Sequence, residues 1–285
     1  MTGESGKGST FRVGLIQTRS GRSPAANLEA VVKLIGEAKE GGACYVQTPE
    51  MTNIMEVSRD KLLAAITPEE NDASLAMFRE LARKFSIYLH IGSLAVKATP
   101  DKAANRSFLI DPHGEIAARY DKIHMFDVDL ANGESYRESR SYRPGELAVL
   151  HDLPWGRLGL TICYDLRFPA FSRNRWDTEN AGGPDFDLLI YVANWPDARA
   201  YAWQTLLRAR AIENVCYVAG VNRVGSDGNG LHYAGDSAVL DFMGSPISEC
   251  ADREVVTTTT LQAAELQAFR ARFTALQDGD RVAWD

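Results

Sequence analysis

The hydrophobic residues of this chain fall in short runs of strand length that alternate with segments of helical spacing. The first half predicts, in order, a strand at 11–18, a helix from Asn27 as N-cap to Gly41 as stop, a strand at 43–50, a helix at 74–85, a strand at 87–96 and a hairpin at 105–122. The second half repeats this order, with a strand at 157–163, the start of a helix at 168–176, a strand at 187–194, a helix at 198–214, a strand at 215–222, a hairpin-like unit at 235–250 and a closing helix at 261–273. The alternation predicts an α/β protein with helices covering mixed sheets, because two hairpins exclude a purely parallel sheet.

The two similar halves could form two sheets that pack face to face with helices outside. No Pro/Ser-rich linker divides the chain, so we expect one domain over residues 11–275. We expect flexible tails at 1–10, which is rich in Gly and Ser, and at 276–285. The polar, turn-rich segment 129–145 should be the least ordered internal stretch.

Composition and charge narrow the classes of partner. The chain has 285 residues, a net charge of −7 and a pI of about 5.4, so we expect no nucleic-acid or membrane partner. Its longest apolar runs are far shorter than the roughly 18 residues of a membrane span, and its opening residues lack the apolar core of a secretory signal.

The four cysteines are scattered, without a C-x-x-C pair, which indicates a reducing cytoplasm and neither a disulfide framework nor a zinc site. Two of them, Cys44 and Cys216, lie in apolar runs and should belong to the core.

Three reactive side chains stand at the carboxyl ends of predicted strands, where α/β folds form their ligand crevices. They are Glu50, Lys122 and Cys163. A cysteine attacks as the thiolate, so Cys163 needs a base and a positive neighbour. Glu50 can take the thiol proton, and Lys122 can stabilise first the thiolate and then an oxyanion. A helix starting near residue 168 would also favour the anion.

The motifs PEM around Glu50, YDKIHMFDVD around Lys122 and LTICYDLRFP around Cys163 together resemble the nitrilase superfamily of carbon–nitrogen hydrolases. The resemblance implies a four-layer α-β-β-α sandwich, no metal or organic cofactor, and association into a homodimer or larger homo-oligomer. It makes Glu50 the general base, Lys122 the electrostatic stabiliser and Cys163 the nucleophile. It further implies that Glu138 positions the lysine, and the backbone N–H of Tyr164 is our candidate oxyanion donor.

Different parts of the chain resemble two different branches of the family. Residues 191–237 resemble the ω-amidases, which hydrolyse the terminal amide of 2-oxo-acid amides such as 2-oxoglutaramate. Residues 126–146 look more like the amidases of deaminated glutathione. We therefore expect hydrolysis of a small linear amide through a thioester, with a 2-oxoglutaramate-like substrate first, and deaminated glutathione, another linear amide or a nitrile as alternatives.

Such a substrate carries a carboxylate, which calls for cationic or amide donors away from the cysteine. The candidates for charge are Arg167, Arg173, Arg175 and Arg199. Asn194 and Trp195 end a strand beside the expected site, so Trp195 could form a wall of the pocket.

Two other interpretations remain open. A Cys–His hydrolase would need a histidine beside Cys163, and the chain offers His90, His113, His124, His151 and His232. A non-catalytic binding protein with the same fold would not need a reactive Cys163. Rapid labelling of Cys163 by a thiol reagent would argue against this second alternative.

Overall fold

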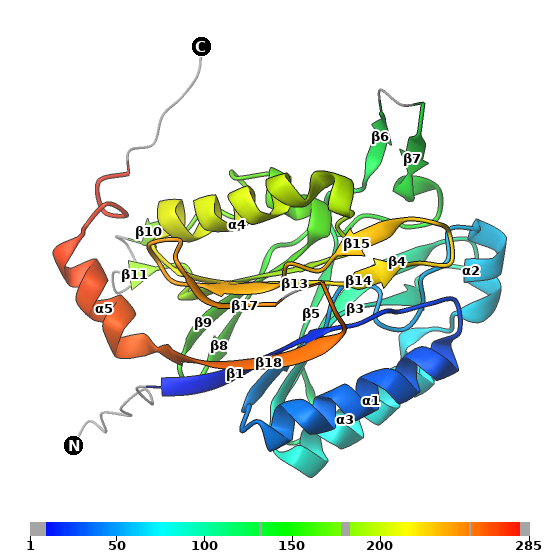
Figure 1. Ribbon diagram of the computed structural model, residues 1–285, viewed down its shortest axis with the longest axis horizontal. Helices are drawn as coiled ribbons and strands as arrows, with labels where there is room; N and C mark the ends of the chain where they lie inside the picture. The colour runs from blue at the N-terminus through cyan, green and yellow to red at the C-terminus, as the bar shows by residue number, and fades with distance from the viewer. Residues whose placement is uncertain (1–9, 131–132, 178–182, 251, 280–285) are drawn as a thin grey trace.

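The computed structural model describes residues 10–130, 133–177, 183–250 and 252–279. The expected tails at 1–10 and 276–285 fall largely outside this range, as do residues 131–132 of the expected loop 129–145. The chain forms four layers, with two mixed sheets in the middle and helices on both outer faces (Figure 1). This arrangement confirms the predicted α-β-β-α sandwich.

Each sheet has six strands, of which the central three are parallel. The first has the order β18 (Val255–Gln262), β1 (Thr10–Gln17), β2 (Tyr45–Gln47), β3 (Tyr88–Lys97), β4 (Ala103–Ile110), β5 (Ile116–Asp121). The second has the order β17 (Pro246–Glu249), β16 (Ala238–Leu240), β13 (Tyr217–Asn222), β12 (Leu188–Ala193), β9 (Gly156–Ile162), β8 (Val149–Leu153). The strands outside each parallel core pair antiparallel, as the two predicted hairpins require.

The helices cover the outer faces of the sheets. On the first sheet lie α1 (Pro24–Glu40) and α3 (Ala73–Phe85), and on the second lies α4 (Ala200–Asn214) (Figure 1). The remaining helices and 3-10 turns are α2 (Arg59–Ala65), α5 (Ala263–Arg272), η1 (Glu69–Asn71), η2 (Glu138–Arg140), η3 (Cys163–Arg167) and η4 (Asp197–Arg199). The short strands are β6 (Asp127–Asp129), β7 (Ser135–Arg137), β10 (Trp176–Asp177), β11 (Gly183–Pro184), β14 (Val224–Ser226) and β15 (His232–Ala234). None of the helices among the described residues has the length and apolar character needed to cross a bilayer.

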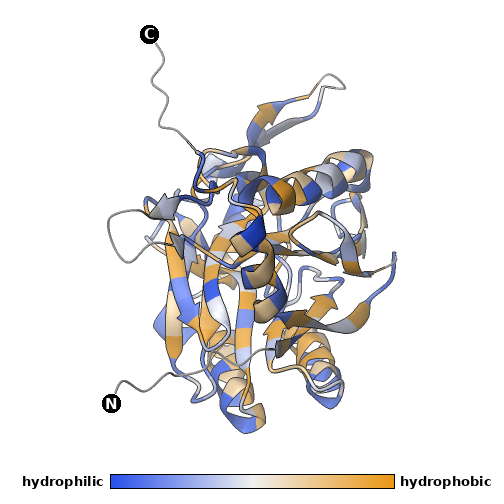
Figure 2. Ribbon diagram, turned by 90° about the vertical axis from the view of Figure 1, so that its left-hand side faces the viewer, coloured by the Kyte–Doolittle hydropathy of each residue, from blue (hydrophilic) through white to orange (hydrophobic). Residues whose placement is uncertain are grey.

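The side-chain alternation of β12 shows why the molecule is layered. Leu188, Ile190 and Val192 point into the core between the two sheets. Leu189 and Tyr191 point the other way, into the core under α4. Because both faces of the strand are buried, its sequence LLIYVA is almost entirely apolar. Figure 2 shows hydrophobic residues along the strands of the sheets, and helices that carry both hydrophobic and hydrophilic residues.

Some details differ from the predictions. Helix α1 begins at Pro24 with Ser23 as its N-cap, so Asn27 lies inside the helix and is not its cap. The helix predicted at 168–176 is absent: the 3-10 turn η3 ends at Arg167 and turns follow up to β10. Within the segment 129–145, β7 pairs with β6 as a short hairpin and η2 follows it, while most of the other described residues of the segment lie outside helices and strands. Cys216 is buried, whereas Cys44 is only partly buried.

Candidate active site

The three reactive side chains predicted from the sequence line one pocket of about 250 Å³ at the carboxyl ends of the strands. Lys122 directly follows β5 and Cys163 directly follows β9, while Glu50 stands three residues after β2. Glu138, at the start of η2, lines the same pocket. The fold therefore brings together four residues that are up to 113 positions apart in the chain (163 − 50).

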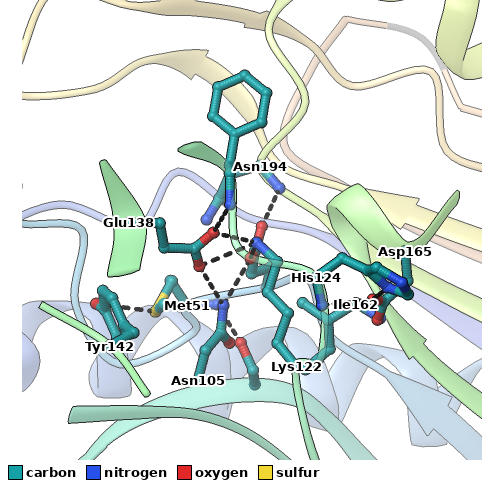
Figure 3. Close-up of polar contacts among 12 residues, drawn as sticks. Met51, Asn105, Lys122, His124, Glu138, Tyr142, Ile162, Asp165 and Asn194 are labelled. Carbon is teal, nitrogen blue, oxygen red and sulfur yellow. Dashed lines mark hydrogen bonds and ion pairs between the residues drawn. The ribbon is translucent and has the colours of Figure 1, made fainter. Parts of the chain in front are cut away.

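Lys122 is buried between two carboxylates (Figure 3). Its Nζ lies 3.2 Å from Glu50 Oε1, and 3.0 and 2.8 Å from the two carboxylate oxygens of Glu138. Glu138 is itself held by the backbone N–H of Phe126, which donates to its Oε2 at 2.7 Å. The carboxylate of Glu138 thus fixes the ammonium group in the pocket, as expected for a residue that positions the lysine.

Glu50 is fixed by donors from both sheets. Asn105 on β4 donates to its Oε1 at 2.8 Å, and the backbone N–H of Asn194, just past β12, donates to its Oε2 at 2.8 Å. The carboxylate is buried, so these bonds hold it in one orientation. Glu50 therefore reaches across the interface between the two sheets to the cysteine side of the pocket.

Asn105 is a site residue that the sequence reasoning missed. Its Nδ2 faces both Glu50 and, at 3.4 Å, Glu138 Oε1. The backbone carbonyl of Asn105 accepts a hydrogen bond from the Lys122 backbone N–H at 3.0 Å, because β4 and β5 form a hairpin. A register shift in this hairpin, between Leu109 and Ile110, determines which residue lies beside Lys122. If residues are counted back from the turn without this register shift, a residue other than Asn105 is placed beside Lys122. The sequence alone therefore did not identify Asn105 as a site residue.

Cys163 has an unusual backbone and a protonated side chain. Its φ of 48° lies in the left-handed region that residues with a Cβ rarely adopt. Burial raises the pKa of its thiol well above the ordinary value, and the charge of Glu50 raises it further, while Lys122 acts in the opposite direction. Two carboxylates and one ammonium group already surround the sulfur, so a thiolate would add a second net negative charge to the pocket. The resting side chain is therefore the thiol, and a base must remove its proton during reaction.

The charge of Lys122 is stable in this setting. Burial alone would lower its pKa, but the neighbouring charges of Glu138 and Glu50 outweigh burial, and the pKa lies well above the ordinary value. Lys122 therefore remains a cation and is available to stabilise negative charge on sulfur or on an oxyanion.

Tyr164 also lines the pocket, next to the nucleophile. It belongs to the 3-10 turn η3, which begins at Cys163. The first N–H groups of such a turn have no acceptor within it, so the Tyr164 N–H is free to point at a ligand. The longer helix that we expected to follow is absent, and its dipole therefore contributes nothing to the cysteine.

The other side of the pocket carries two arginines and two strand-end residues. The guanidinium of Arg167 lies 5.0 Å from the ring of Trp195, and that of Arg199 lies 5.6 Å from the ring of Phe126. Trp195 is buried and forms a pocket wall, and the Asn194 side chain points at Met55 Sδ. In the part of the chain that the structure describes, neither Arg167 nor Arg199 forms an ion pair.

Arg173 and Arg175 are not part of the pocket. Arg173 donates to the carbonyl of Glu213, and Arg175 pairs with Asp185 at 3.1 Å. The sequence offered all four arginines as candidates for substrate binding. The structure places Arg173 and Arg175 on the surface and outside the pocket.

The histidines do not build a Cys–His site. His124 lies in the loop after β5, and its Nδ1 contacts Asp165 Oδ1 at 2.6 Å. His90 pairs with Ser107, and His232 pairs with Ser226. Across residues 10–130, 133–177, 183–250 and 252–279, no histidine hydrogen-bonds to the Cys163 sulfur, and no three His, Cys, Asp or Glu side chains are grouped to hold a metal ion.

Comparisons with known proteins agree with the three motifs. The family model for carbon-nitrogen hydrolases matches residues 12–271. The chain is 44% identical to Omega-amidase YafV of Yersinia enterocolitica over 191 residues, which are 67% of this chain and 68% of that protein. It is 34% identical to the deaminated glutathione amidase of the same organism over 269 residues, which are 93% of this chain and 91% of that protein.

A solved structure shows the same fold. It is a CN-hydrolase superfamily protein from Xanthomonas campestris with an arsenic adduct in its active site. The two chains are 40% identical and superpose with a TM-score of 0.86 over 97% of this chain and 99% of that one. Because the family model spans most of the sequence and both curated relatives exceed 30% identity, this chain belongs to the carbon–nitrogen hydrolase family of the nitrilase superfamily.

Proposed function

We propose that the protein is a cysteine-dependent amidohydrolase that cleaves the terminal carboxamide of a small 2-oxo-acid amide. The observation that carries the proposal is the convergence of Glu50, Lys122 and Cys163 in one pocket, with Lys122 Nζ 3.2 Å from Glu50. One carboxylate, one ammonium and one thiol supply a base, an electrostatic stabiliser and a nucleophile.

The reaction begins with a protonated thiol. Cys163 Sγ attacks the amide carbonyl carbon while Glu50 takes the thiol proton. Lys122 Nζ and the Tyr164 N–H stabilise the oxyanion of the tetrahedral intermediate. The intermediate then expels ammonia, which receives the proton held by Glu50, and a thioester remains on Cys163.

The second half of the reaction releases the acid. Glu50, again a carboxylate, takes a proton from water, and the resulting hydroxide attacks the thioester carbonyl. The Cys163 sulfur leaves and regains a proton from Glu50, so the resting site is restored. Glu138 takes no proton in this scheme, and its role is to hold Lys122 at 2.8 Å.

The charge of the pocket supports this substrate class. Arg167 and Arg199 are cations without an ionic partner among the described residues, and both line the pocket that holds Cys163. They fit the carboxylate of an amide-bearing acid, which would bind away from the sulfur. Among such acids we place 2-oxoglutaramate first, because the relative of highest identity quoted above is named an ω-amidase. Deaminated glutathione is the second candidate, since the relative matched over the greater length is named for it.

The decisive experiment measures formation of the 2-oxo-acid product from 2-oxoglutaramate and from deaminated glutathione, together with ammonia release from glutamine and from a simple nitrile. We expect fastest turnover of 2-oxoglutaramate and none by Cys163→Ala. Faster turnover of deaminated glutathione would reverse the order of the two substrates. Product formation by Cys163→Ala at the wild-type rate would refute the mechanism.

Substitution of the arginines tests the carboxylate subsite. Arg167→Met and Arg199→Met should each raise KM by about 10- to 100-fold with a smaller change in kcat, because a charge-assisted hydrogen bond contributes about 1.5–3 kcal/mol. Arg173→Met removes the same charge outside the pocket and serves as the matched control. An unchanged KM in both pocket variants would exclude this subsite.

We also propose a homodimer or larger homo-oligomer in a reducing compartment such as the cytoplasm. All four cysteines are free, and the exposed face of α4 carries Tyr201, which is 82% exposed, and Ile212, which is 53% exposed. Such apolar exposure is typical of association surfaces. Analytical ultracentrifugation of the wild type, and of a Tyr201→Glu variant that should dissociate, tests the assembly.

A further inference from the structure

Asp165 is a fully buried carboxylate that lies two residues after Cys163 but does not line the pocket. The mechanism above gives it no role. Burying a carboxylate is costly unless several donors compensate it, so its environment calls for an explanation.

Four donors converge on this carboxylate, two on each oxygen. Figure 3 shows Asp165 with Ile162 and His124 beside it. The backbone N–H of Ile162 donates to Oδ2 at 2.8 Å, and the hydroxyl of Tyr120 donates to the same oxygen at 2.6 Å. The backbone N–H of His124 donates to Oδ1 at 3.2 Å, and the His124 ring Nδ1 lies 2.6 Å from that oxygen. Since a carboxylate has no proton to give, Nδ1 is the donor of this last bond.

The positions of these donors are more informative than their number. Ile162 immediately precedes Cys163, while Tyr120 and His124 stand two residues on either side of Lys122. A single buried side chain therefore ties the backbone of the nucleophile's turn to both flanks of the lysine. The His124 ring also stacks on Phe168, with centroids 3.7 Å apart, which joins the same two loops a second time.

The backbone at Cys163 needs such support. Its φ of 48° is strained for a residue with a Cβ, and strained conformations persist only where the surroundings hold them. The bond from Ile162 N–H to Asp165 spans this strained residue and keeps the turn closed.

We propose that Asp165 is a positioning residue that sets the placement of the Cys163 sulfur relative to the Lys122 ammonium. The inference rests on the proposed function, in which Lys122 stabilises charge on the sulfur and on the oxyanion. Asp165 does not touch the substrate and acts only through the two loops.

The substitution Asp165→Asn is the sharpest test of this role. Each carboxylate oxygen accepts one backbone N–H, from Ile162 on one side and from His124 on the other. An amide can accept on one side only. Whichever way the Asn side chain turns, one backbone N–H meets an NH₂ group and loses its acceptor, so one of the two loops is released. The nearly equal size of Asn keeps the packing unchanged.

The first readout is the steady-state reaction on the substrate that the wild type turns over. We expect Asp165→Asn to lower kcat about 100-fold with KM changed less than about threefold, because a misplaced reacting group costs about that factor. Tyr120→Phe removes one donor and should lower kcat less. Tyr191→Phe is its matched control, since it removes a buried hydroxyl that donates to Ser172 at 2.8 Å and should cost similar thermal stability without a change in kcat.

The second readout needs no turnover. Iodoacetamide alkylation rates of Cys163 are measured at one pH for the wild type, Lys122→Met, Asp165→Asn and the double variant, with Cys163→Ala as background. If Asp165 holds the sulfur beside Lys122, removing Lys122 slows alkylation in the wild type but has little effect in Asp165→Asn. Any general change in access cancels in this double-mutant cycle.

The outcomes separate this proposal from the proposed function. Additive effects in the cycle, or a wild-type kcat in folded Asp165→Asn, overturn the positioning role. Absence of Cys163-dependent turnover in the wild type refutes the proposed function, while the alkylation cycle still decides for or against Asp165. A further arm uses His124→Asn, whose side-chain nitrogen can take the place of Nδ1. His124→Asn should retain the activity that His124→Ala loses. Loss of activity in both variants would show that donation to Asp165 is not the role of the ring.

Discussion

The pKa of the Cys163 thiol responds to neighbouring charges of both signs. Burial raises its pKa most, the carboxylates of Glu50 and Glu138 raise it further, and Lys122 lowers it. Alkylation follows the thiolate fraction, so its rate should still rise with pH above neutrality, by a factor of about ten per pH unit. At a fixed pH, Glu138→Gln should lower the thiol pKa and speed alkylation, whereas Lys122→Met should raise it and slow alkylation.

Turnover should not follow the alkylation rate in these variants. Glu138→Gln makes the sulfur more reactive but weakens the hold on Lys122, whose Nζ lies 2.8 Å from the carboxylate. We therefore expect slower hydrolysis together with faster alkylation. Stopped-flow alkylation and steady-state kinetics on the same preparations check both signs. A pH-independent alkylation rate between pH 6 and 8 would mean that the thiolate is the resting form.

The start of α1 shows how one side chain can organise a loop. Asn27 is buried and bonds to the N–H and the carbonyl of Gly21, at 2.7 and 2.8 Å, and to the carbonyl of Asn53 at 2.9 Å. Asn27→Ala should lower the free energy of unfolding by about 2–3 kcal/mol, since each such bond contributes about 1 kcal/mol. Ser23→Ala removes the exposed N-cap, whose bond is 3.4 Å long, and should cost less than about 1 kcal/mol. Urea denaturation of both variants measures the difference, and equal losses would contradict this assignment.

The same helix marks the limit of what the sequence could predict. Hydrophobic periodicity identified α1 because the buried side of the helix is determined locally, but it could not distinguish Ser23 from Asn27 as the cap, because both residue types are suitable. The helix expected at 168–176 failed for a related reason. The Asn174 side chain binds backbone groups of Phe186 and Asn214, and these tertiary bonds compete with a helix there. The positions of Glu50, Lys122 and Cys163 followed from strand ends, whereas the partners of Asp165 depend on contacts between distant loops.

The two ends of the second sheet have separate tasks. The carboxyl ends of β9 and β12 lead into the pocket, while α5 ties together the segments that precede β12 and β13. Arg270 on α5 is buried, donates to the carbonyls of Val215 and Phe186 at 2.9 Å each, and pairs with Asp187 at 2.5 Å. Because α5 directly follows β18 of the first sheet, this one side chain joins the two sheets at the end away from the site.

Removal of that arginine should therefore affect stability and leave catalysis intact. Arg270→Met leaves Asp187 without its ionic partner and two carbonyls without donors, so we expect a loss of about 3 kcal/mol in the free energy of unfolding. Arg272→Met is the matched control on the same helix. Its side chain is exposed and, among the described residues, bonds only to the carbonyl of Ala268, so the loss should stay within about 0.5 kcal/mol. Thermal and urea unfolding measure the difference, and kcat is measured well below the melting temperature. A fall in kcat of folded Arg270→Met would show that the amino ends of the strands also control the geometry of Cys163, because no pocket residue contacts this arginine among those that the structure describes.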